Sequence, residues 1–135
     1  MKAHNFNLPD QDNKLHALES YKGKWVVLYF YPEDDTPGCT KEACSFRDNL
    51  ANLQDLGVIV LGVSKDSVSS NKKFAQKYHL NFPLLEDTKG FTIKAYNVLG
   101  RTTYLINPEG DIAKVYEKVD PINHAELILK FYQRK

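Results

Sequence analysis

Two short apolar runs with a helical pattern between them constrain the fold of this chain most. Trp25–Tyr31 is an unbroken series of β-branched and aromatic residues that ends at a proline, and Gly57–Val63 has the same character. Such runs are typical of strands buried on both faces. Between them, Thr36–Leu56 predicts a helix whose apolar face recurs at helical spacing and comprises Cys39, Ala43, Phe46, Leu50 and Leu53. A strand, a helix and a strand in this order predict two parallel strands joined by a right-handed crossover.

Beyond this unit, the chain continues to alternate between strand and helix patterns. The periodicity predicts a helix over Ser67–Tyr78, with Phe74, Ala75 and Tyr78 facing inward, and a short helix beginning at Asp87. These helices would cover the strands that the first unit supplies, because an amphipathic helix buries its apolar stripe against a sheet.

The last third predicts a hairpin and a helix. The strand patterns Thr102–Ile106 and Ile112–Tyr116 flank Asn107–Asp111, whose proline and glycine favour a turn, so this pair is expected to be antiparallel. The last helix is expected to have Asp120 as N-cap and Pro121 as its first residue, with an apolar face of Ala125, Ile128, Leu129 and Tyr132. The order of elements predicts an α/β protein with a central mixed sheet flanked by helices, the thioredoxin-like arrangement. The length of 135 residues predicts one domain over 1–135.

Composition excludes several classes of protein. Eighteen Lys and Arg against 17 Asp and Glu give a net charge of +1, which argues against a nucleic-acid binder. Two cysteines are too few for a disulfide-dense scaffold or a four-cysteine metal site. The N-terminal residues lack a signal-like apolar segment, and the longest apolar run is too short to span a membrane. We therefore expect a cytoplasmic protein, in which a cysteine pair is reactive or metal-bound rather than structural.

No cofactor or metal site is expected. The four histidines are scattered without ligand spacing and are interpreted as surface or packing residues: His4, His16, His79 and His124. The acidic run Glu33–Asp35 is interpreted as a solvated loop. The sequence contains neither a glycine-rich phosphate loop nor a nucleophile elbow.

The segment between the first strand and its helix carries the chemistry. Thr36 suits the N-cap and Pro37 the first helical position, so Cys39 falls in the first turn, among amide N–H groups that lack intrahelical partners. A helix N-terminus favours the anionic form of a thiol, and the thiolate is the nucleophile. A reactive Cys39 is therefore predicted. The alternative is a small buried residue that happens to begin a helix.

Cys44 lies five residues further along the same predicted helix. In an ideal helix such residues have Cα atoms about 8–9 Å apart and point in different directions, whereas a disulfide needs Cα atoms within about 7 Å. The two cysteines can therefore bond only if the first turns unwind. The alternative for Cys44 is a packed core thiol.

Pro32, Thr36 and Cys39 have the spacing of the peroxiredoxin active-site motif, and Cys44 matches a resolving cysteine five residues on. The chain closely resembles peroxiredoxins of the bacterioferritin-comigratory (PrxQ) subfamily over nearly its whole length. Arg101, just ahead of a predicted strand, takes the place of the family's active-site arginine; by itself it would be interpreted as a surface charge. Further matching segments are Phe6–Asp10, Tyr21–Lys24, Gly62–Ser67 and Phe82–Leu85.

The resemblance implies reduction of hydrogen peroxide and organic hydroperoxides. Cys39 would be the peroxidatic cysteine that becomes a sulfenic acid, and Cys44 the resolving cysteine of an intramolecular disulfide. A thioredoxin-type dithiol would reduce that disulfide, as in atypical 2-Cys peroxiredoxins. Arg101 would hold the thiolate and the peroxide, and the Thr36 hydroxyl would bond to both. Pro32 would shield the sulfur from water. The resemblance also implies a monomer.

The chain departs from the family at one place near the predicted site. Relatives carry a longer segment between the equivalent of Tyr96–Val98 and the arginine, where this chain has only Leu99 and Gly100. Two other functions stay open on the residues alone. A thioredoxin-like oxidoreductase would be expected to have two residues between its cysteines, whereas this chain has four. A non-enzymatic redox switch would be oxidised without efficient turnover.

Overall fold

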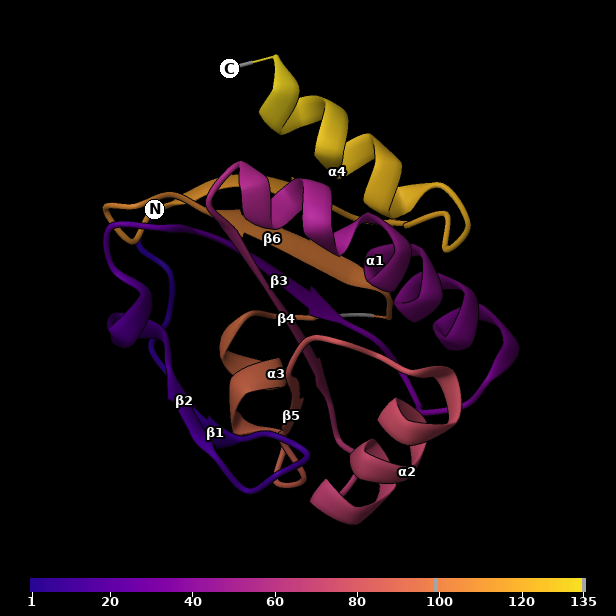
Figure 1. Cartoon of the computed structure of the whole chain (residues 1–135). Coiled ribbons are helices and arrows are strands. Elements are labelled where there is room, and N and C mark those ends of the chain that lie inside the picture. The colour runs from indigo at the N-terminus through magenta and orange to yellow at the C-terminus, as the bar shows by residue number, and fades with distance from the viewer. Residues whose placement is uncertain (99, 135) are drawn as a thin grey trace.

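A five-stranded mixed sheet forms the centre of the molecule (Figure 1), and the computed structural model describes residues 1–98 and 100–134. The strand order is β5, β4, β3, β6, β7. Strands β3, β4 and β5 run parallel, whereas β6 pairs antiparallel with β3 and with β7. The bounds are β3 Trp25–Phe30, β4 Val58–Ser64, β5 Leu84–Glu86, β6 Thr102–Ile106 and β7 Ile112–Tyr116. The predicted parallel pair, the antiparallel hairpin and the mixed α/β sheet are confirmed.

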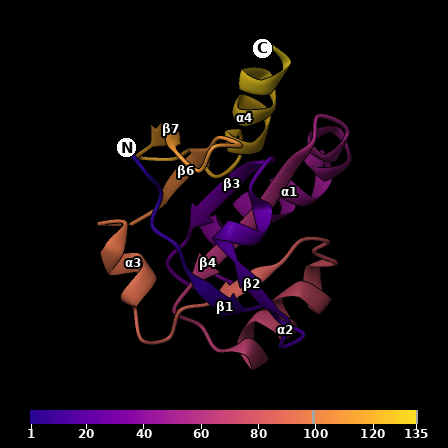
Figure 2. The ribbon, with the colours of Figure 1, turned by 90° about the vertical axis from the view of Figure 1, so that its left-hand side faces the viewer.

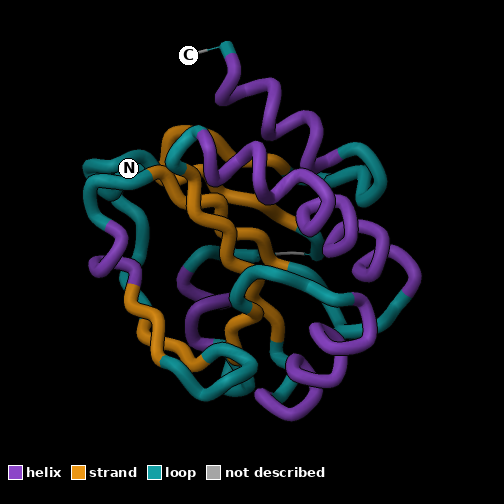
Figure 3. Tube along the Cα trace, viewed as in Figure 1, coloured by secondary structure: helices purple, strands orange, loops and turns teal. Residues whose placement is uncertain are grey.

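Helices flank this sheet (Figure 3). They are α1 Pro37–Asp55, α2 Val68–Tyr78, α3 Phe91–Ala95 and α4 His124–Gln133. A separate antiparallel hairpin of β1 (Asn7–Pro9) and β2 (Leu15–Ala17), followed by the 3-10 turn η1 (Leu18–Tyr21), lies outside the main sheet (Figure 2). The sequence patterns predicted neither this hairpin nor β5, because three-residue strands are too short to show a period. No helix of the described residues is long and apolar enough to cross a membrane.

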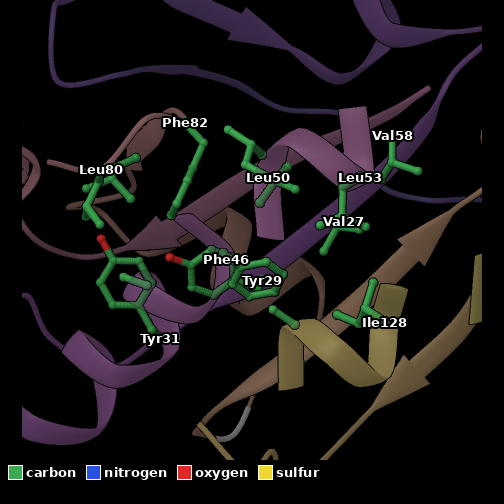
Figure 4. Close-up of a cluster of buried hydrophobic side chains, with 14 of the residues drawn as sticks. Val27, Tyr29, Tyr31, Phe46, Leu50, Leu53, Val58, Leu80, Phe82 and Ile128 are labelled. Atoms are coloured by element: carbon green, nitrogen blue, oxygen red, sulfur yellow. The ribbon is translucent and has the colours of Figure 1, made fainter. Parts of the chain in front are cut away.

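The alternation of side chains along β3 divides the core into two clusters. Val27, Tyr29 and Tyr31 point to the face covered by α1, α2 and α4 (Figure 4), where Phe46, Leu53 and Ile128 pack against them. The residues between them face the N-terminal segment and α3: Val26, Leu28 and Phe30. Burial on both faces explains why the run lacks polar residues. The predicted inner face of α1 is buried throughout, since Cys39, Ala43, Phe46, Leu50 and Leu53 are at most 4% exposed.

Two predicted helix starts are wrong. The last helix begins at His124 with Asn123 as N-cap. Asp120 instead accepts hydrogen bonds from the Ile122 N–H and the Asn123 side chain, so it closes a turn ahead of the helix. The short helix begins at Phe91, because the Asp87 carboxylate accepts the N–H groups of Thr92 and Ile93 from a position outside the helix. Side-chain acceptors at a turn and at an N-cap look alike in sequence.

The topology brings one arginine to the start of α1. The chain leaves the carboxyl end of β3 after Phe30 and enters α1 at Pro37. In the antiparallel pairing of β3 with β6, Phe30 lies opposite Thr102. The residue before Thr102 therefore lies beyond the carboxyl end of β3, where the loop to α1 begins. That residue is Arg101. The sequence prediction of an unusually short connection ahead of it involves Leu99, which lies outside the described residues.

Candidate active site

Cys39 lies in the first turn of α1 and is 1% exposed. Thr36 is the N-cap with an extended backbone, Pro37 takes the first helical position, and the Thr40 N–H donates to the Thr36 carbonyl oxygen at 2.8 Å. The predicted helix start is therefore confirmed. The thiol sits where backbone N–H groups are unpaired and the helix dipole is positive, which favours an anion.

The Arg101 guanidinium contacts this thiol directly. Its Nη1 lies 3.4 Å from Cys39 Sγ, and the same nitrogen donates to Glu42 Oε1 at 3.0 Å. Its Nη2 lies over Gly38, where an added Cβ would come within 2.7 Å of it. Gly38 therefore leaves the room that the guanidinium occupies beside the helix. The structure brings together Cys39 and Arg101, which are 62 residues apart in sequence.

Glu42 is a member of this cluster that the sequence patterns missed. It is fully buried one turn after Cys39, and its Oε2 has no partner among the described residues. Burial raises the pKa of the Glu42 carboxyl to about 7, although the hydrogen bond and charge of Arg101 lower it. A signal was present: Glu42 is a carboxylate on the apolar side of the predicted helix, next to Ala43. A buried carboxyl usually requires a charged partner.

Two further buried groups surround the cluster. Tyr29 stacks on Phe46 with ring centroids 4.6 Å apart, and burial together with the charges of Glu42 and Cys39 raises the pKa of its hydroxyl. His124 donates or accepts at 2.8 Å from Thr103 Oγ1, and burial with the charge of Arg101 lowers its pKa to about 4. His124 is therefore neutral near pH 7, so Arg101 supplies the positive charge at Cys39.

Cys44 is half-buried on the same helix, and both cysteines are free thiols. The helix is continuous from Pro37 to Asp55. The prediction that the two cysteines are separated by intact helical turns is thus confirmed, and a bridge between them requires those turns to unwind.

Pro32 and Thr36 frame the loop before α1. Pro32 is exposed and lines a cavity of about 170 Å³ together with Lys65, Ile93 and Val98. The Thr36 hydroxyl donates to the Glu33 carbonyl oxygen at 3.0 Å rather than to the sulfur. Its lone pairs stay free to accept a hydrogen bond, and a rotation about its side-chain torsion would be needed to donate to Cys39.

The acidic run ahead of α1 is not simply solvated. Asp34 is half-buried and accepts hydrogen bonds from Tyr31 Oη at 2.7 Å and Ser70 Oγ at 2.8 Å. Asp35 is exposed and bonds to Lys77 and Tyr78. The interpretation of Glu33–Asp35 as a solvated loop is therefore wrong for Asp34. One of its partners, Tyr31, directly follows β3, and the other, Ser70 of α2, could not be found from local spacing.

Two of the histidines are buried and make structural contacts, and the other two are exposed. His16 is buried between Asp10 at 2.7 Å and Tyr21 at 2.6 Å, and His124 packs against Phe46 and Tyr116. His4 and His79 are exposed. Within residues 1–98 and 100–134, no group of three or more His, Cys, Asp or Glu side chains could hold a metal ion. The chemistry supported by the geometry is nucleophilic attack by a thiolate beside a fixed guanidinium.

The chain is similar to known proteins over most of its length. A family model described as the AhpC/TSA family matches residues 1–115. A Coxiella burnetii protein assigned as a bcp-type peroxiredoxin is 46% identical over 141 aligned positions, which cover 94% of this chain and 93% of the relative. Because 141 positions exceed the 135 residues of the chain, the relative carries residues that this chain lacks.

A chloroplast peroxiredoxin Q of Triticum aestivum is 43% identical over 96% of this chain, which spans 64% of that relative's length. Among solved structures, a bacterioferritin comigratory protein of Xanthomonas campestris superimposes with a TM-score of 0.92 at 32% identity, covering 96% of this chain and 90% of that one. The structure of that protein was described in terms of its alkyl peroxide reduction activity. These similarities extend through the whole thioredoxin-like sheet.

Proposed function

Because this chain belongs to the AhpC/TSA family, as a peroxiredoxin of the bacterioferritin-comigratory (PrxQ) subfamily, we propose that Cys39 carries its thiol-dependent peroxidase activity. The observation that carries this assignment is the contact of 3.4 Å between the buried Cys39 sulfur and the Arg101 guanidinium. Cys44 has no comparable cation within hydrogen-bond distance among the described residues. A thiolate needs such a fixed charge in a site from which water is excluded.

In the first step, the Cys39 thiolate attacks the terminal oxygen of the peroxide. A sulfur–oxygen bond forms as the oxygen–oxygen bond breaks, sulfur loses two electrons, and the leaving oxygen takes a proton and departs as water or an alcohol. Arg101 stabilises the charge as it moves from sulfur to the leaving oxygen, because its N–H donors are already in place. Glu42 holds the guanidinium from the buried side at 3.0 Å.

Thr36 and Pro32 complete the peroxide pocket in this proposal. Thr36 stands at the helix N-cap, three residues before the sulfur, and its hydroxyl can bond to the peroxide after leaving the Glu33 carbonyl. Pro32 lies at the exposed edge and offers no N–H that would compete for the thiolate. Hydrogen peroxide is the proposed substrate, and organic hydroperoxides are added on the analogy of the Xanthomonas campestris protein, which was described in terms of its alkyl peroxide reduction activity.

In the second step, Cys44 attacks the Cys39 sulfenic acid. A disulfide forms and water leaves, so the chain follows the atypical 2-Cys cycle. The first turns of α1 must unwind before the bond can close. A thioredoxin-type dithiol then reduces the bridge by thiol–disulfide exchange.

The proposal also includes the domain organisation, the oligomeric state and the cellular location of the protein. Residues 1–135 form a single domain that acts as a monomer, which the continuity of one central sheet supports. The reducing cytoplasm is its proposed location, since a free cysteine pair suits that compartment.

The deciding experiment measures the second-order rate of hydrogen peroxide consumption by the fully reduced protein, with intact mass read at the end. We expect the folded protein to react orders of magnitude faster than the same chain in urea, and to end two hydrogens lighter. A folded rate no faster than the unfolded rate would show that the fold does not activate Cys39. The oxidoreductase and redox-switch functions would then be the ones to pursue.

A further inference from the structure

The loop between Pro32 and Thr36 has little backbone support. The last sheet hydrogen bond at this edge is from the Tyr31 N–H to the Val63 carbonyl oxygen, and α1 begins only at Pro37. Asp35 within the loop adopts a left-handed backbone conformation with φ of 59°. Thr36 is held by the Thr40 N–H at the start of the helix, whereas the segment from Pro32 to Asp35 depends on side-chain contacts for its placement.

Asp34 supplies those contacts from the middle of the loop. Its carboxylate accepts hydrogen bonds from Tyr31 Oη at 2.7 Å and Ser70 Oγ at 2.8 Å. The fully buried Asn71, with its amide nitrogen turned toward the loop, donates to both carboxylate oxygens at 2.7 and 3.2 Å. We call these four residues the clasp: Tyr31, Asp34, Ser70 and Asn71. It joins the loop to α2 across 36 residues of sequence.

The backbone of Asp34 is held as well, since its N–H donates to Asp66 Oδ2 at 2.9 Å. The clasp therefore fixes both the position and the orientation of the residue that lies two places after Pro32 and two places before Thr36. All of the side chains that face its carboxylate are donors, so the arrangement suits the ionised acid.

Burial of this carboxylate opposes stability near neutral pH. Burial and the negative charges of Asp66 and Asp35 together raise the pKa of Asp34 to about 6, although the hydrogen bonds from Tyr31 and Ser70 lower it. Ser70 and Asn71, which face it from α2, carry no charge, and Lys77 is paired with Asp35 instead. Since the folded pKa lies above the ordinary value of 3.8, the stability that Asp34 contributes falls as the pH rises from 3.8 to about 6 and stays lower above this range. Residues retained at such a cost are frequently functional.

We propose that Asp34 is a positioning residue for the peroxide step, because the clasp holds Pro32, Thr36 and the first turn of α1 in the arrangement that reacts. The inference rests on the proposed function of Cys39. Asp34 does not touch the sulfur; it acts through the loop. When the first turns of α1 unwind for disulfide formation, the clasp keeps the preceding loop attached to α2, so that Cys39 returns to its place after reduction.

The test compares Asp34→Asn with Asp35→Asn. Both substitutions remove one carboxylate charge from the same loop, but Asp35 bonds to exposed partners, and such pairs contribute little. Sulfenic acid formation is followed in a single turnover with hydrogen peroxide. Asp34→Asn places an amide N–H among donors, so we expect this step to slow by about tenfold. We expect Asp35→Asn to stay close to the parent protein.

Two readouts separate positioning from general stability. At pH 8 the thermal midpoint of Asp34→Asn is expected to equal or exceed that of the parent protein, since the charge that opposes folding is gone. The ratio of parent to variant rate is expected to shrink from pH 8 to pH 5 as Asp34 becomes protonated in the parent. Glu42 is present in both proteins, so its titration contributes equally to both rates.

The outcomes distinguish this inference from the proposed function. A parent protein that reduces no peroxide faster than its unfolded chain contradicts the function itself. A fast parent protein with an equally fast Asp34→Asn variant overturns the role of Asp34 alone, as does a ratio that is independent of pH. If Asp34→Asn fails to fold, Ser70→Ala removes one donor from the surface side of the clasp and is expected to slow the same step by a smaller factor. An unchanged rate in that variant would also overturn the role of Asp34.

Discussion

The two cysteines of α1 lie five residues apart on one continuous helix, yet their surroundings differ. Cys39 is 1% exposed in the first turn, with Arg101 at 3.4 Å and Glu42 behind that arginine. Cys44 is half-buried one turn later. The nearby Arg47 directs its guanidinium to the Tyr78 carbonyl oxygen and to Asp48. The reactivity of a thiol therefore depends on the charged groups and hydrogen-bond donors that the fold places beside it.

The contrast has a topological cause. Arg101 reaches the first turn because β6 runs antiparallel to β3, which places the start of β6 at the end of β3. The rest of α1 packs against β4 and α4. The charge that acts on Cys44 is that of Arg47 on the same helix, and its hydrogen bonds go to the Tyr78 carbonyl oxygen and to Asp48. In the proposed cycle, Cys39 is therefore the cysteine that attacks the peroxide, and Cys44 the one that attacks the resulting sulfenic acid.

The difference between Cys39 and Cys44 is tested most strongly by replacing the sulfur of each cysteine with oxygen. Cys39→Ser is expected to abolish peroxide reduction, because a serine hydroxyl is hardly ionised and cannot form the sulfenic acid. The measurement is peroxide consumption by the reduced variant. Any saturable activity that survives would mean that Cys44 or another group is the nucleophile.

Cys44→Ser is expected to separate the two steps. The variant should consume about one peroxide per chain at the parent rate and then stall, because the sulfenic acid has no partner. Intact mass after one turnover should show an added oxygen instead of the loss of two hydrogens. Normal turnover of this variant with a thioredoxin system would contradict the assignment of Cys44 as the resolving cysteine.

Removal of the Arg101 cation should make the surroundings of Cys39 resemble those of Cys44. Arg101→Met is expected to slow the peroxide step by about 100-fold or more, since one preorganised donor at a site of developing charge contributes on that order. Arg134→Met, at the exposed end of α4, provides the matched control and should react like the parent protein. An unaffected Arg101→Met variant would show that the helix N-terminus alone activates Cys39.

The sequence predicted the helix and missed most of this contrast. The apolar face of α1 and the strands on either side follow from local periodicity, which is why Cys39, Phe46 and Leu53 were predicted to be buried. Arg101 entered through resemblance to a family, because no local pattern reveals which strand pairs with β3. Asp34 and Glu42 were missed for the same reason, since Ser70 lies 36 residues from Asp34 and Arg101 lies 59 residues from Glu42.

Errors at the helix starts have a different physical origin. Asp120 and Pro121 form the signature of a helix N-terminus, but here Asp120 closes a turn that ends at Asn123, the N-cap of α4. The same side-chain chemistry stabilises both structures, and the choice between them depends on where Ala125 and Ile128 can reach the core. Tertiary packing therefore determines where α4 begins, because the capping residues alone fit either start.

A subtler change displaces the arginine without removing it. Gly38→Ala adds a methyl group that would lie 2.7 Å from Arg101 Nη2, so the guanidinium must shift. We expect the peroxide step to slow by about tenfold or more. Alanine favours a helix by up to about 1 kcal/mol over glycine, but the shift of the guanidinium weakens its ion pair with the buried Glu42, so thermal stability is expected to fall. Asn52→Ala, at an exposed position of α1, should show only the effect of helix propensity; a parallel slowing in both variants would exclude displacement of Arg101 as the cause.

The smallest expected effect concerns the carboxylate that shares the arginine with Cys39. Glu42→Gln keeps an oxygen that can accept from Arg101 but removes the charge, so the peroxide step should change less than in Gly38→Ala. The larger signal lies in stability. Burial raises the folded pKa of Glu42 to about 7 from its ordinary value of 4.5, so the folded state binds more protons than the unfolded state between these values. The stability of the parent protein should therefore fall from pH 5 to pH 8 through this group, whereas the variant should lack this decline.

The check is the difference in thermal midpoint between Glu42→Gln and the parent protein at pH 5 and at pH 8. We expect the difference to shift in favour of the variant by on the order of 5 °C over this range. Glu126→Gln, an exposed position on α4, should show no such shift. A difference that stays constant with pH would mean that Arg101 keeps Glu42 ionised throughout. The guanidinium would then be neutralised by its buried partner, and Cys39 would owe its distinction from Cys44 mainly to its place at the start of the helix.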